Sequence, residues 1–249
     1  MRHLVLTDIH ANLEALDTVL ADARQRGFDD VVVLGDVVGY GADPNAVVER
    51  IRELQPLAIV RGNHDKVSCG LESADGFNSV AKAAVRWTLD ALTSENRQWV
   101  AAMRQGPLAV DIDVEICHGS PIDEDEYIFG AAEAQIALLT TTRPVCLFGH
   151  THYPAVFASL NGTIESARMA TSVEPELMLH TGLKYLINPG SVGQPRDGDP
   201  RAAYAIVDVP AGRVDLIRLS YDVHTAQEKI RNLVLEAYQE FEERAAIAS

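Results

Sequence analysis

Short apolar strands alternate with amphipathic helices through the first 60 residues, and this alternation constrains the fold more than any other feature of the sequence. Residues 4–6, 31–34 and 57–60 are apolar runs of strand length. Between them lie two helical patterns: one is capped by Asn12 and ends at Gly27, and the other opens at Asp43-Pro44. Strands that alternate with helices predict βαβ units with right-handed crossovers, and therefore a parallel sheet.

The rest of the chain contains more strands and fewer crossovers. We expect two helices within residues 78–103, with Ser94 as the cap of the second, and further helices at 131–139 and 226–244. Strands are expected at residues 108–116, 145–148, 183–187, 203–209 and 214–219, with a hairpin at 156–164 around Asn161-Gly162. These strands predict a second sheet packed on the first, and hence an α/β protein with two packed sheets flanked by helices. No linker or low-complexity run divides residues 1–249, so we expect one domain, with a helical insertion at 67–105 that roofs a pocket.

The overall charge argues against a broad binding surface for nucleic acid. The chain has 21 Lys and Arg against 36 Asp and Glu, a formal net charge of −15, whereas long nucleic acids are held by clustered basic side chains. The first apolar stretch is too short for a signal peptide, and no run has the length of a membrane span. Cys69, Cys117 and Cys146 show no CxxC spacing and are expected to be reduced and mostly buried. We therefore expect a cytoplasmic protein with no membrane partner.

Five short polar motifs follow apolar runs at points where a glycine or a turn begins. They are Asp8-Ile9-His10, Gly35-Asp36, Gly62-Asn63-His64-Asp65, His118-Gly119 and Gly149-His150-Thr151-His152. In an open α/β sheet the ligand crevice lies outside the carboxyl ends of the strands, so motifs that are distant in sequence meet at one edge. Together the motifs supply Asp, Asn and His but no Cys, which is a ligand set suited to a pair of divalent first-row metals.

The spacing within the motifs adds a geometric expectation. Side chains at i and i+2 of an extended segment point the same way, so Asp8 converges with His10, and His150 with His152. The two carboxylate oxygens of Asp36 can bridge two cations. Two metals about 3.5–4 Å apart clamp the attacking and leaving oxygens of a displacement, and a hydroxide that bridges both metals is a nucleophile near neutral pH. No Ser, Cys or Lys nucleophile is then required.

Each motif taken alone also has an ordinary structural explanation. Asp8-Ile9-His10 and Gly35-Asp36 can be turns, the motif around Asn63 can be a loop that caps its own backbone, and His118 can be a half-buried histidine with a satisfied hydrogen bond. The presence of all five motifs in one chain favours a metal site, because clusters of such residues are typical of metal-binding and catalytic sites.

In this order the five motifs resemble those of the calcineurin-like metallophosphoesterases, whose pattern is D-x-H, G-D, G-N-H-D/E, H and G-H-x-H. The resemblance extends through Asn188-Pro189-Gly190-Ser191, which looks like the return strand and loop of the compact bacterial members. It implies a four-layer αββα sandwich of two mixed sheets. One small departure is Ala11-Asn12, where many members have Gly-Asn, because it places a Cβ close to the site.

The resemblance also implies roles for individual residues. One metal would be held by Asp8, His10, Asp36 and His152, and the other by Asp36, Asn63, His118 and His150. His64 would protonate the leaving oxygen or stabilise the transition state, and Asp65 would orient the His64 imidazole. The cofactors would be two divalent metal ions, Mn, Fe, Zn or a mixture, with Mn favoured.

Two further segments contain residues that can line a site. Residues 35–41 look like a nucleotide-binding loop but lack the G-x-G-x-x-G spacing, so we expect a rim that lets the backbone approach the metals. Residues 190–200 form a long polar loop in which Arg196 can bind a substrate phosphate bidentately. The alternative for Arg196 is a surface ion pair with Asp197 or Asp199. For Arg61, which precedes the Asn63 motif, a salt bridge is favoured.

We therefore expect a metal-dependent phosphoesterase that hydrolyses a phosphomonoester or phosphodiester of a small molecule. A nuclease of the same family fits less well, because the acidic surface would repel a long polyanion. The alternative from another class is a catalytically impaired protein-interaction scaffold on the same fold, and the intact His64 and both ligand sets argue against it. The sequence does not identify the physiological substrate, the metal used or the oligomeric state.

Overall fold

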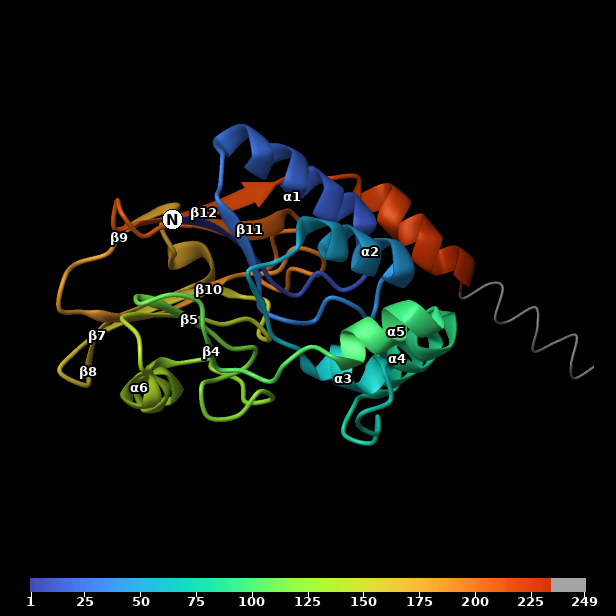
Figure 1. The fold of residues 1–249 in the computed structure, drawn as a ribbon, viewed down its shortest axis with the longest axis horizontal. Helices are drawn as coiled ribbons and strands as arrows, with labels where there is room; N and C mark the ends of the chain where they lie inside the picture. The colour runs from blue at the N-terminus through green and yellow to red at the C-terminus, as the bar shows by residue number, and fades with distance from the viewer. Residues whose placement is uncertain (234–249) are drawn as a thin grey trace, which may run out of the picture.

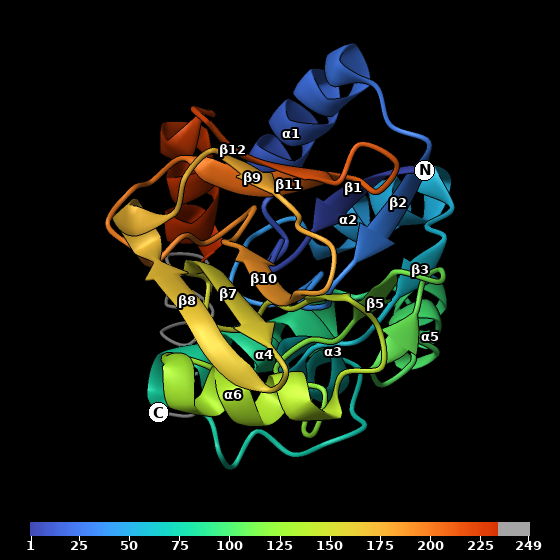
Figure 2. The ribbon, with the colours of Figure 1, turned by 90° about the vertical axis from the view of Figure 1, so that its left-hand side faces the viewer.

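Two six-stranded sheets pack face to face, with helices on both outer sides (Figures 1 and 2). The computed structural model describes residues 1–233. The strand order is β3-β2-β1-β11-β12-β9 in the first sheet and β4-β5-β6-β10-β7-β8 in the second. Figure 2 shows α1 above the first sheet and α6 below the second. The expected α/β class, with two packed mixed sheets flanked by helices, is thereby confirmed.

The first sheet joins strands from both ends of the chain. Its members are β1 (Arg2–Leu6), β2 (Asp30–Val33), β3 (Ala58–Ile59), β9 (Glu176–Met178), β11 (Ala202–Asp208) and β12 (Arg213–Leu219). The first three run parallel, and the crossovers between them are α1 (Leu13–Arg26) and α2 (Pro44–Leu54), as the alternation predicts. β11 pairs antiparallel with the free edge of β1, and β12 and β9 follow it outward.

The second sheet has a parallel centre and antiparallel margins. Its members are β4 (Leu108–Ala109), β5 (Val114–Ile116), β6 (Val145–Leu147), β7 (Pro154–Leu160), β8 (Thr163–Met169) and β10 (Lys184–Pro189). β5, β6 and β10 run parallel to one another. β7 and β8 form the predicted hairpin, and both turn residues, Asn161 and Gly162, have the positive φ that such a turn requires. α6 (Ala131–Thr140) covers this sheet.

Three helices form the insertion beside the sandwich (Figure 1). They are α3 (Asn63–Ser68), α4 (Ser79–Ala91) and α5 (Ser94–Ala101). The cap of α5 is Thr93, whose side chain accepts from the Asn96 amide, so the prediction of Ser94 was wrong by one residue. A short 3-10 helix, η1, spans Ala170–Ser172. A further helix begins at residue 223 and is described to residue 233, and the rest of the one predicted at 226–244 lies outside the described residues.

Two strand predictions were wrong. The second half of the chain does not form a sheet of its own, because β9, β11 and β12 complete the first sheet along the edge that the βαβ units leave open. Residues 108–116 do not form one strand either. The Asp111 carboxylate accepts from the Asp113 and Val114 amides, at 2.8 Å each, and this turn splits the segment into the antiparallel pair β4 and β5.

The parallel strands of the first sheet are buried on both faces. Leu4 and Leu6 face the core under α1 and α2, whereas Val5 between them faces the core that separates the two sheets. The same alternation holds for Val31 and Val33 against Val32. Burial on both sides explains why these strands are continuous apolar runs. This burial also holds the strands in place, so the points at which they end and the site loops begin are fixed.

Within residues 1–233, none of the helices has both the length and the apolar character that crossing a bilayer requires.

Asn12 caps α1 and also connects it to two distant segments. Its Oδ1 accepts from the Ala15 amide at 3.1 Å, and its Nδ2 donates to the Gly193 carbonyl at 2.9 Å and to the Tyr221 hydroxyl at 3.1 Å. Asn12→Ala should therefore lower the free energy of unfolding by about 3 kcal/mol, from a cap and two hydrogen bonds worth about 1 kcal/mol each. Urea denaturation in the presence of EDTA measures this loss.

Thr93→Ala is the matched control, because within residues 1–233 the Thr93 hydroxyl makes only the cap contact to Asn96. It should cost about 1 kcal/mol. Equal losses for the two variants would show that the long-range contacts of Asn12 contribute nothing to stability.

Candidate metal centre

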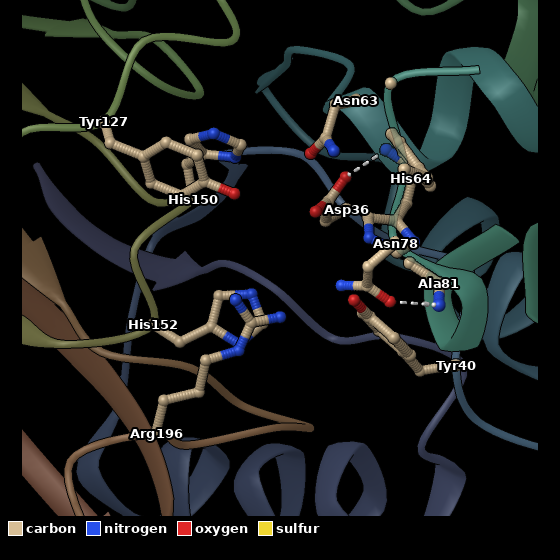
Figure 3. Close-up of a pocket in the computed structure, with 12 residues that line it drawn as sticks. Asp36, Tyr40, Asn63, His64, Asn78, Ala81, Tyr127, His150, His152 and Arg196 are labelled. Atoms are coloured by element: carbon tan, nitrogen blue, oxygen red, sulfur yellow. Dashed lines mark hydrogen bonds between the residues drawn. The ribbon is translucent and has the colours of Figure 1, made fainter. Parts of the chain in front are cut away.

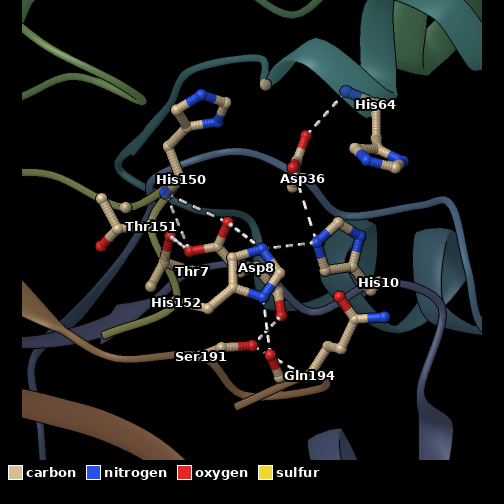
Figure 4. Close-up of polar contacts among 12 residues, drawn as sticks. Thr7, Asp8, His10, Asp36, His64, His150, Thr151, His152, Ser191 and Gln194 are labelled. Atoms are coloured by element: carbon tan, nitrogen blue, oxygen red, sulfur yellow. Dashed lines mark hydrogen bonds and ion pairs between the residues drawn. The ribbon is translucent and has the colours of Figure 1, made fainter. Parts of the chain in front are cut away.

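The loops that follow the parallel strands are hydrogen-bonded to one another. The Asp8 amide donates to the Gly35 carbonyl at 3.1 Å, and the His10 amide donates to the Asp36 carbonyl at 2.9 Å. The loop after β10 closes the arrangement, since the Ser191 hydroxyl donates to the Asp8 carbonyl at 2.8 Å. Motifs far apart in the sequence are thus held side by side at one edge of the sandwich (Figure 4).

Most of the converging residues have a left-handed backbone. The φ angles of Asp8, His10, Asp36, His150 and His152 are 50°, 50°, 51°, 67° and 61°. The motif pairs converge, but the extended geometry expected for them was wrong. Left-handed conformations cost roughly 1–2 kcal/mol per non-glycine residue. Such strain persists where the surrounding structure imposes it, and it is concentrated at functional sites.

Glycines allow these segments to approach one another closely. A Cβ on Gly35, which has φ +94°, would lie 2.6 Å from the Gly62 amide nitrogen and 2.8 Å from Nδ1 of His118. A Cβ on Gly39, at φ +90°, would lie 2.5 Å from Nδ1 of His64. Residues 35–41 therefore act as a close-fitting rim around the site histidines.

The first group of converging side chains consists of Asp8, His10, Asp36 and His152. All four are buried, and one ligand atom from each lies within 4.8 Å of the others. Nε2 of His10 is 3.5 Å from Oδ2 of Asp36, and Nε2 of His152 is 3.4 Å from Oδ1 of Asp8. The two imidazole nitrogens are 3.1 Å apart.

The second group shares Asp36 with the first and adds His118 and His150. Nε2 of His118 is 3.5 Å from Oδ2 of Asp36 and 3.1 Å from Nδ1 of His150. Asn63 follows β3, and its Oδ1 is buried without a hydrogen-bond partner in residues 1–233. Oδ2 of Asp36 is thus equally distant from a histidine of each group. Oδ1 of Asp36 instead accepts from the His64 amide at 2.9 Å, so a single oxygen lies between the two groups.

Each of the four histidines contacts a backbone carbonyl through the ring nitrogen that faces away from the cluster. The carbonyls belong to Val38 for His10, Leu34 for His118, Asp125 for His150 and Gln194 for His152, at 2.6–3.2 Å. A carbonyl only accepts, so the outer nitrogen carries the proton, and in the neutral ring the inner nitrogen presents a lone pair. Lone pairs 3.1 Å apart repel each other, and a cation between them removes the repulsion. The residues therefore fit divalent metal ions.

The protonation states agree with a ligand role for most of the imidazoles. Burial lowers the pKa of His10 and His152 well below the ordinary range, and it lowers that of His150 to about 3, so these rings are neutral near pH 7. Burial alone would lower the pKa of His118, but attraction to Asp36 and Asp8, together with the hydrogen bonds to Asp36 and the Leu34 carbonyl, outweighs it and raises the pKa to about 10. A proton on His118 occupies the place that a cation would take, so proton and metal compete for this ring.

His64 lies beside the cluster, and Asp65 does not orient its ring. The Asp65 carboxylate accepts from the Gly62 amide at 3.0 Å and from the Val38 amide at 3.1 Å. The expected hydrogen bond between Asp65 and the His64 imidazole was therefore wrong, because the carboxylate caps the start of α3 instead. The His64 ring is held by packing against Tyr40 and Phe77, with ring centroids 4.4 and 4.8 Å away. Burial lowers the pKa of His64 to about 4.

A pocket of about 130 Å³ opens over the cluster. Figure 3 shows Tyr127 and His150 along one side, Tyr40, Asn78 and His64 along the other, and Arg196 at the lower margin. Oδ1 of Asn78 accepts from the Val80 and Ala81 amides at the start of α4, so its amide nitrogen is the part available as a donor. Hydrogen-bond donors therefore surround the open side of the cluster.

Arg196 lines this pocket and makes no ion pair with its acidic neighbours. Its guanidinium donates to Oε1 of Gln194 at 2.7 Å and lies 5.8 Å from the centroid of the Tyr40 ring. Asp197 pairs with Arg218 and Asp199 pairs with Arg201. The alternative of a surface pair for Arg196 is therefore wrong. The salt bridge favoured for Arg61 is confirmed, with Glu124 at 3.0 Å.

Several residues of the site carry no sequence signal. The pocket residues Tyr40, Phe77, Asn78 and Tyr127 come from loops or loop ends without a recognisable pattern. Asp125 and Gln194 contribute backbone carbonyls, which are the same for every residue type. Among these residues, only Tyr40 could have been suspected from the sequence, because it lies within the glycine-rich segment 35–41.

The fold is a sandwich of two mixed sheets, and the site gathers two groups of candidate metal ligands at one edge of it. A family model, the calcineurin-like phosphoesterase superfamily domain, matches residues 1–212. The chain belongs to this superfamily.

Three known proteins resemble the chain over most of its length. An uncharacterised protein of Methanocaldococcus jannaschii is 38% identical over 240 residues, which cover 91% of this chain and 90% of the relative. The crystal structure of a metallophosphoesterase from Sphaerobacter thermophilus is 39% identical with a TM-score of 0.82 and covers 94% of both chains. A hypothetical protein from Pyrococcus horikoshii OT3 has a TM-score of 0.74 and 20% identity, again over 94% of both chains, and shows the shared fold.

The position of Asp36 between the two groups generates a prediction. Asp36→Asn removes the negative charge that faces both groups, so the protein should lose both metals, or nearly all activity. Metal content after dialysis against Mn²⁺ should fall from about two ions per chain to less than one. Asp22→Asn, a change at a carboxylate that pairs with Arg26 on α1, is the control and should retain both. An Asp36→Asn protein with two tightly bound ions would contradict the bridging position.

Proposed function

We propose that this protein is a dinuclear metal-dependent phosphoesterase that hydrolyses a phosphomonoester or phosphodiester of a small molecule. The observation that carries the proposal is the single Asp36 oxygen that lies 3.5 Å from a buried histidine of each group. One ion would be held by Asp8, His10, Asp36 and His152, and the other by Asp36, Asn63, His118 and His150. Nitrogen and oxygen donors without thiolate suit Mn²⁺, with Fe or Zn as alternatives.

Bound metal ions would supply Lewis acidity toward the phosphoryl oxygens and would activate water as a nucleophile near neutral pH. The chain's own residues bind and orient the substrate. Arg196 has guanidinium donors beyond those used by Gln194, and a guanidinium matches the geometry of two phosphate oxygens. Burial raises the pKa of Tyr40 and Tyr127, so both hydroxyls keep their protons and can donate to the same group.

His64 contributes to catalysis as a neutral donor. Its pKa of about 4, lowered mainly by burial, leaves the ring uncharged near pH 7. A neutral imidazole stabilises charge on a phosphoryl or leaving oxygen by hydrogen bonding, and it is a weaker proton source than an imidazolium. Of the two roles implied for His64, transition-state stabilisation therefore fits better. Asp65 supports this role indirectly, by fixing the loop that carries His64.

The helical insertion limits the size of the substrate. Gly76, Phe77, Asn78 and Ala81 line the pocket that opens over the cluster, and its volume is about 130 Å³. A phosphoryl group with a compact ester fits this space, whereas a nucleic-acid duplex does not. The net charge of −15 also disfavours a long polyanion. We therefore prefer a small-molecule ester to a nuclease substrate.

The proposal is tested by loading the purified protein with Mn²⁺ and measuring turnover of p-nitrophenyl phosphate, bis(p-nitrophenyl) phosphate and a panel of nucleotides. An EDTA-treated sample is the negative control. Metal-dependent turnover of any ester supports the enzyme. Two bound ions without turnover across the panel would favour the scaffold alternative.

His64→Ala should retain both metals and lower kcat by about 10²–10³-fold, the usual effect of removing one transition-state donor. The fold decrease in kcat should be similar for p-nitrophenyl and alkyl esters. A hydrogen bond that stabilises charge in the transition state does not transfer a proton to the leaving group, so its effect does not depend on how much protonation that group needs. Steady-state kinetics on both ester types measures it, with the exposed His224→Ala as the control. A loss that is much larger for alkyl esters would assign proton donation to His64.

Arg196→Ala should lower kcat/KM by about 10–100-fold at unchanged metal content, because a hydrogen bond to a charged group is worth about 1.5–3 kcal/mol. Arg196→Lys should restore only part of the lost kcat/KM, since an ammonium lacks the planar bidentate geometry with which a guanidinium binds two phosphate oxygens. Arg201→Ala is the control, because Arg201 pairs with Asp199 in the same loop and does not line the pocket. Unchanged kinetics in Arg196→Ala would remove this residue from the site.

A further inference from the structure

A network of charges around the buried side chains of Lys66 and Glu124 joins two segments that flank the second group of side chains. We call it the Lys66 cluster, and its members are Arg61, Lys66, Glu72, Glu124 and Asp125. Lys66 Nζ lies 2.9 Å from Glu72, 3.2 Å from Glu124 and 2.5 Å from Asp125. The Lys66 side chain is only 7% exposed, as is that of Glu124. Three carboxylates therefore converge on one buried ammonium, that of Glu124 from inside the protein and those of Glu72 and Asp125 from the surface.

Arg61 completes the cluster from the other side of Glu124. Its Nε donates to Oε2 at 3.1 Å and its Nη2 donates to Oε1 at 3.0 Å, so the guanidinium binds the Glu124 carboxylate in a bidentate manner through two hydrogen bonds. Buried ion pairs repay little of their desolvation cost and are weak evidence for stability. Their geometry is nevertheless well defined, which suits a role in positioning.

The cluster connects directly to residues of the second group. Lys66 is on α3, three residues after Asn63, which begins that helix. Asp125 is the residue whose backbone carbonyl accepts from Nε2 of His150 at 3.1 Å. The contact between Lys66 and the Asp125 side chain therefore fixes the carbonyl that sets the tautomer and orientation of His150. A histidine ligand depends on such an outer partner for its orientation and its basicity.

The first group has no comparable connection. In residues 1–233, no hydrogen bond or ion pair joins the Lys66 cluster to Asp8, His10 or His152. Their outer contacts run instead to Val38, Gln194 and Ser191. The two groups share Asp36 and the loop after β6, where the His150 amide donates to the Asp8 carboxylate at 3.1 and 3.2 Å, but the outer contacts of their imidazole rings run to different segments.

We propose that Lys66 is a positioning residue for the second metal site alone. It holds the loop of residues 119–127 against α3, and this brings His150 and Asn63 to the distance at which both face one ion. The proposal rests on the dinuclear site of the proposed function. It predicts that the two sites lose affinity independently.

The experiment is a Mn²⁺ titration of the purified full-length chain by calorimetry and by electron paramagnetic resonance. The wild type should bind two ions and give the spectrum of an exchange-coupled pair. In Lys66→Met one site should weaken by about 10–100-fold, the usual effect of losing an outer partner of a ligand, while the other keeps its affinity. At a Mn²⁺ concentration that fills only the tighter site, the spectrum should be that of an isolated ion.

Three further variants separate positioning from general destabilisation. Lys66→Arg keeps a cation against the carboxylates and should restore the second site. Asp125→Asn keeps the backbone carbonyl but removes the charge that Lys66 holds, so it should weaken the same site. Lys229→Met is the matched control, because Lys229 also bridges two carboxylates, Glu14 and Asp43, and should leave both affinities unchanged.

Two results would overturn the proposal. The first is equal weakening of both sites in Lys66→Met and Asp125→Asn, which would indicate a general structural effect. The second is wild-type affinity at both sites in these variants. A wild-type protein that binds fewer than two ions would instead refute the dinuclear function itself, so the two failures are distinguishable.

Discussion

Four inward-facing imidazole nitrogens and two carboxylates share one small buried space, and the rest of the site is organised around the repulsion that this creates. The shortest contact within each group joins two histidine nitrogens at 3.1 Å, and two neutral rings cannot donate to each other there. In the second group the raised pKa of His118, about 10, places a proton in this contact when no metal is bound. The backbone accepts this arrangement only because the outer nitrogens are anchored to carbonyls. Bound divalent cations would turn this repulsion into coordination and would displace the proton of His118, so a geometry that is unfavourable between neutral rings would become favourable in a metal-loaded protein.

The sandwich supplies the rigidity that such a site requires. Five of the residues around the cluster have left-handed backbones, and each of these conformations is unfavourable by itself. They are maintained because the strands that precede them, β1, β2 and β6, are buried on both faces and end at fixed positions. The geometry of the candidate site therefore depends on core packing around the strands, away from the site itself.

Local patterns predicted much of the fold, and non-local pairing explains where they failed. The βαβ units and the turn at Asn161-Gly162 follow from residues near in sequence, and the structure contains them. The segment at 108–116 has the period of a strand, yet the Asp111 carboxylate captures two amides and bends it back. The pairing of β11 with β1 depends on which sheet edge is free, and no periodicity records that.

The same difference between what a residue's type determines and what distant contacts determine applies to the candidate site. Side-chain chemistry identified the Asp, Asn and His residues that the structure brings together, because ligand type is a property of the residue. The left-handed geometry and the contacts of Asp65 were missed, since they depend on backbone positions. The carbonyls of Leu34, Val38, Asp125 and Gln194 could not have been found at all, because every residue carries one.

The position of β1 has a consequence for synthesis on the ribosome. This strand is made first, but its second neighbour, β11, is made some 200 residues later. Until then one edge of the first sheet is unpaired, and exposed strand edges invite association with other chains. The Ser191 hydroxyl that fixes the Asp8 carbonyl also emerges late. A nascent chain therefore carries most of the candidate metal ligands before β11 is made, and thus before the contacts that hold these side chains in place can form.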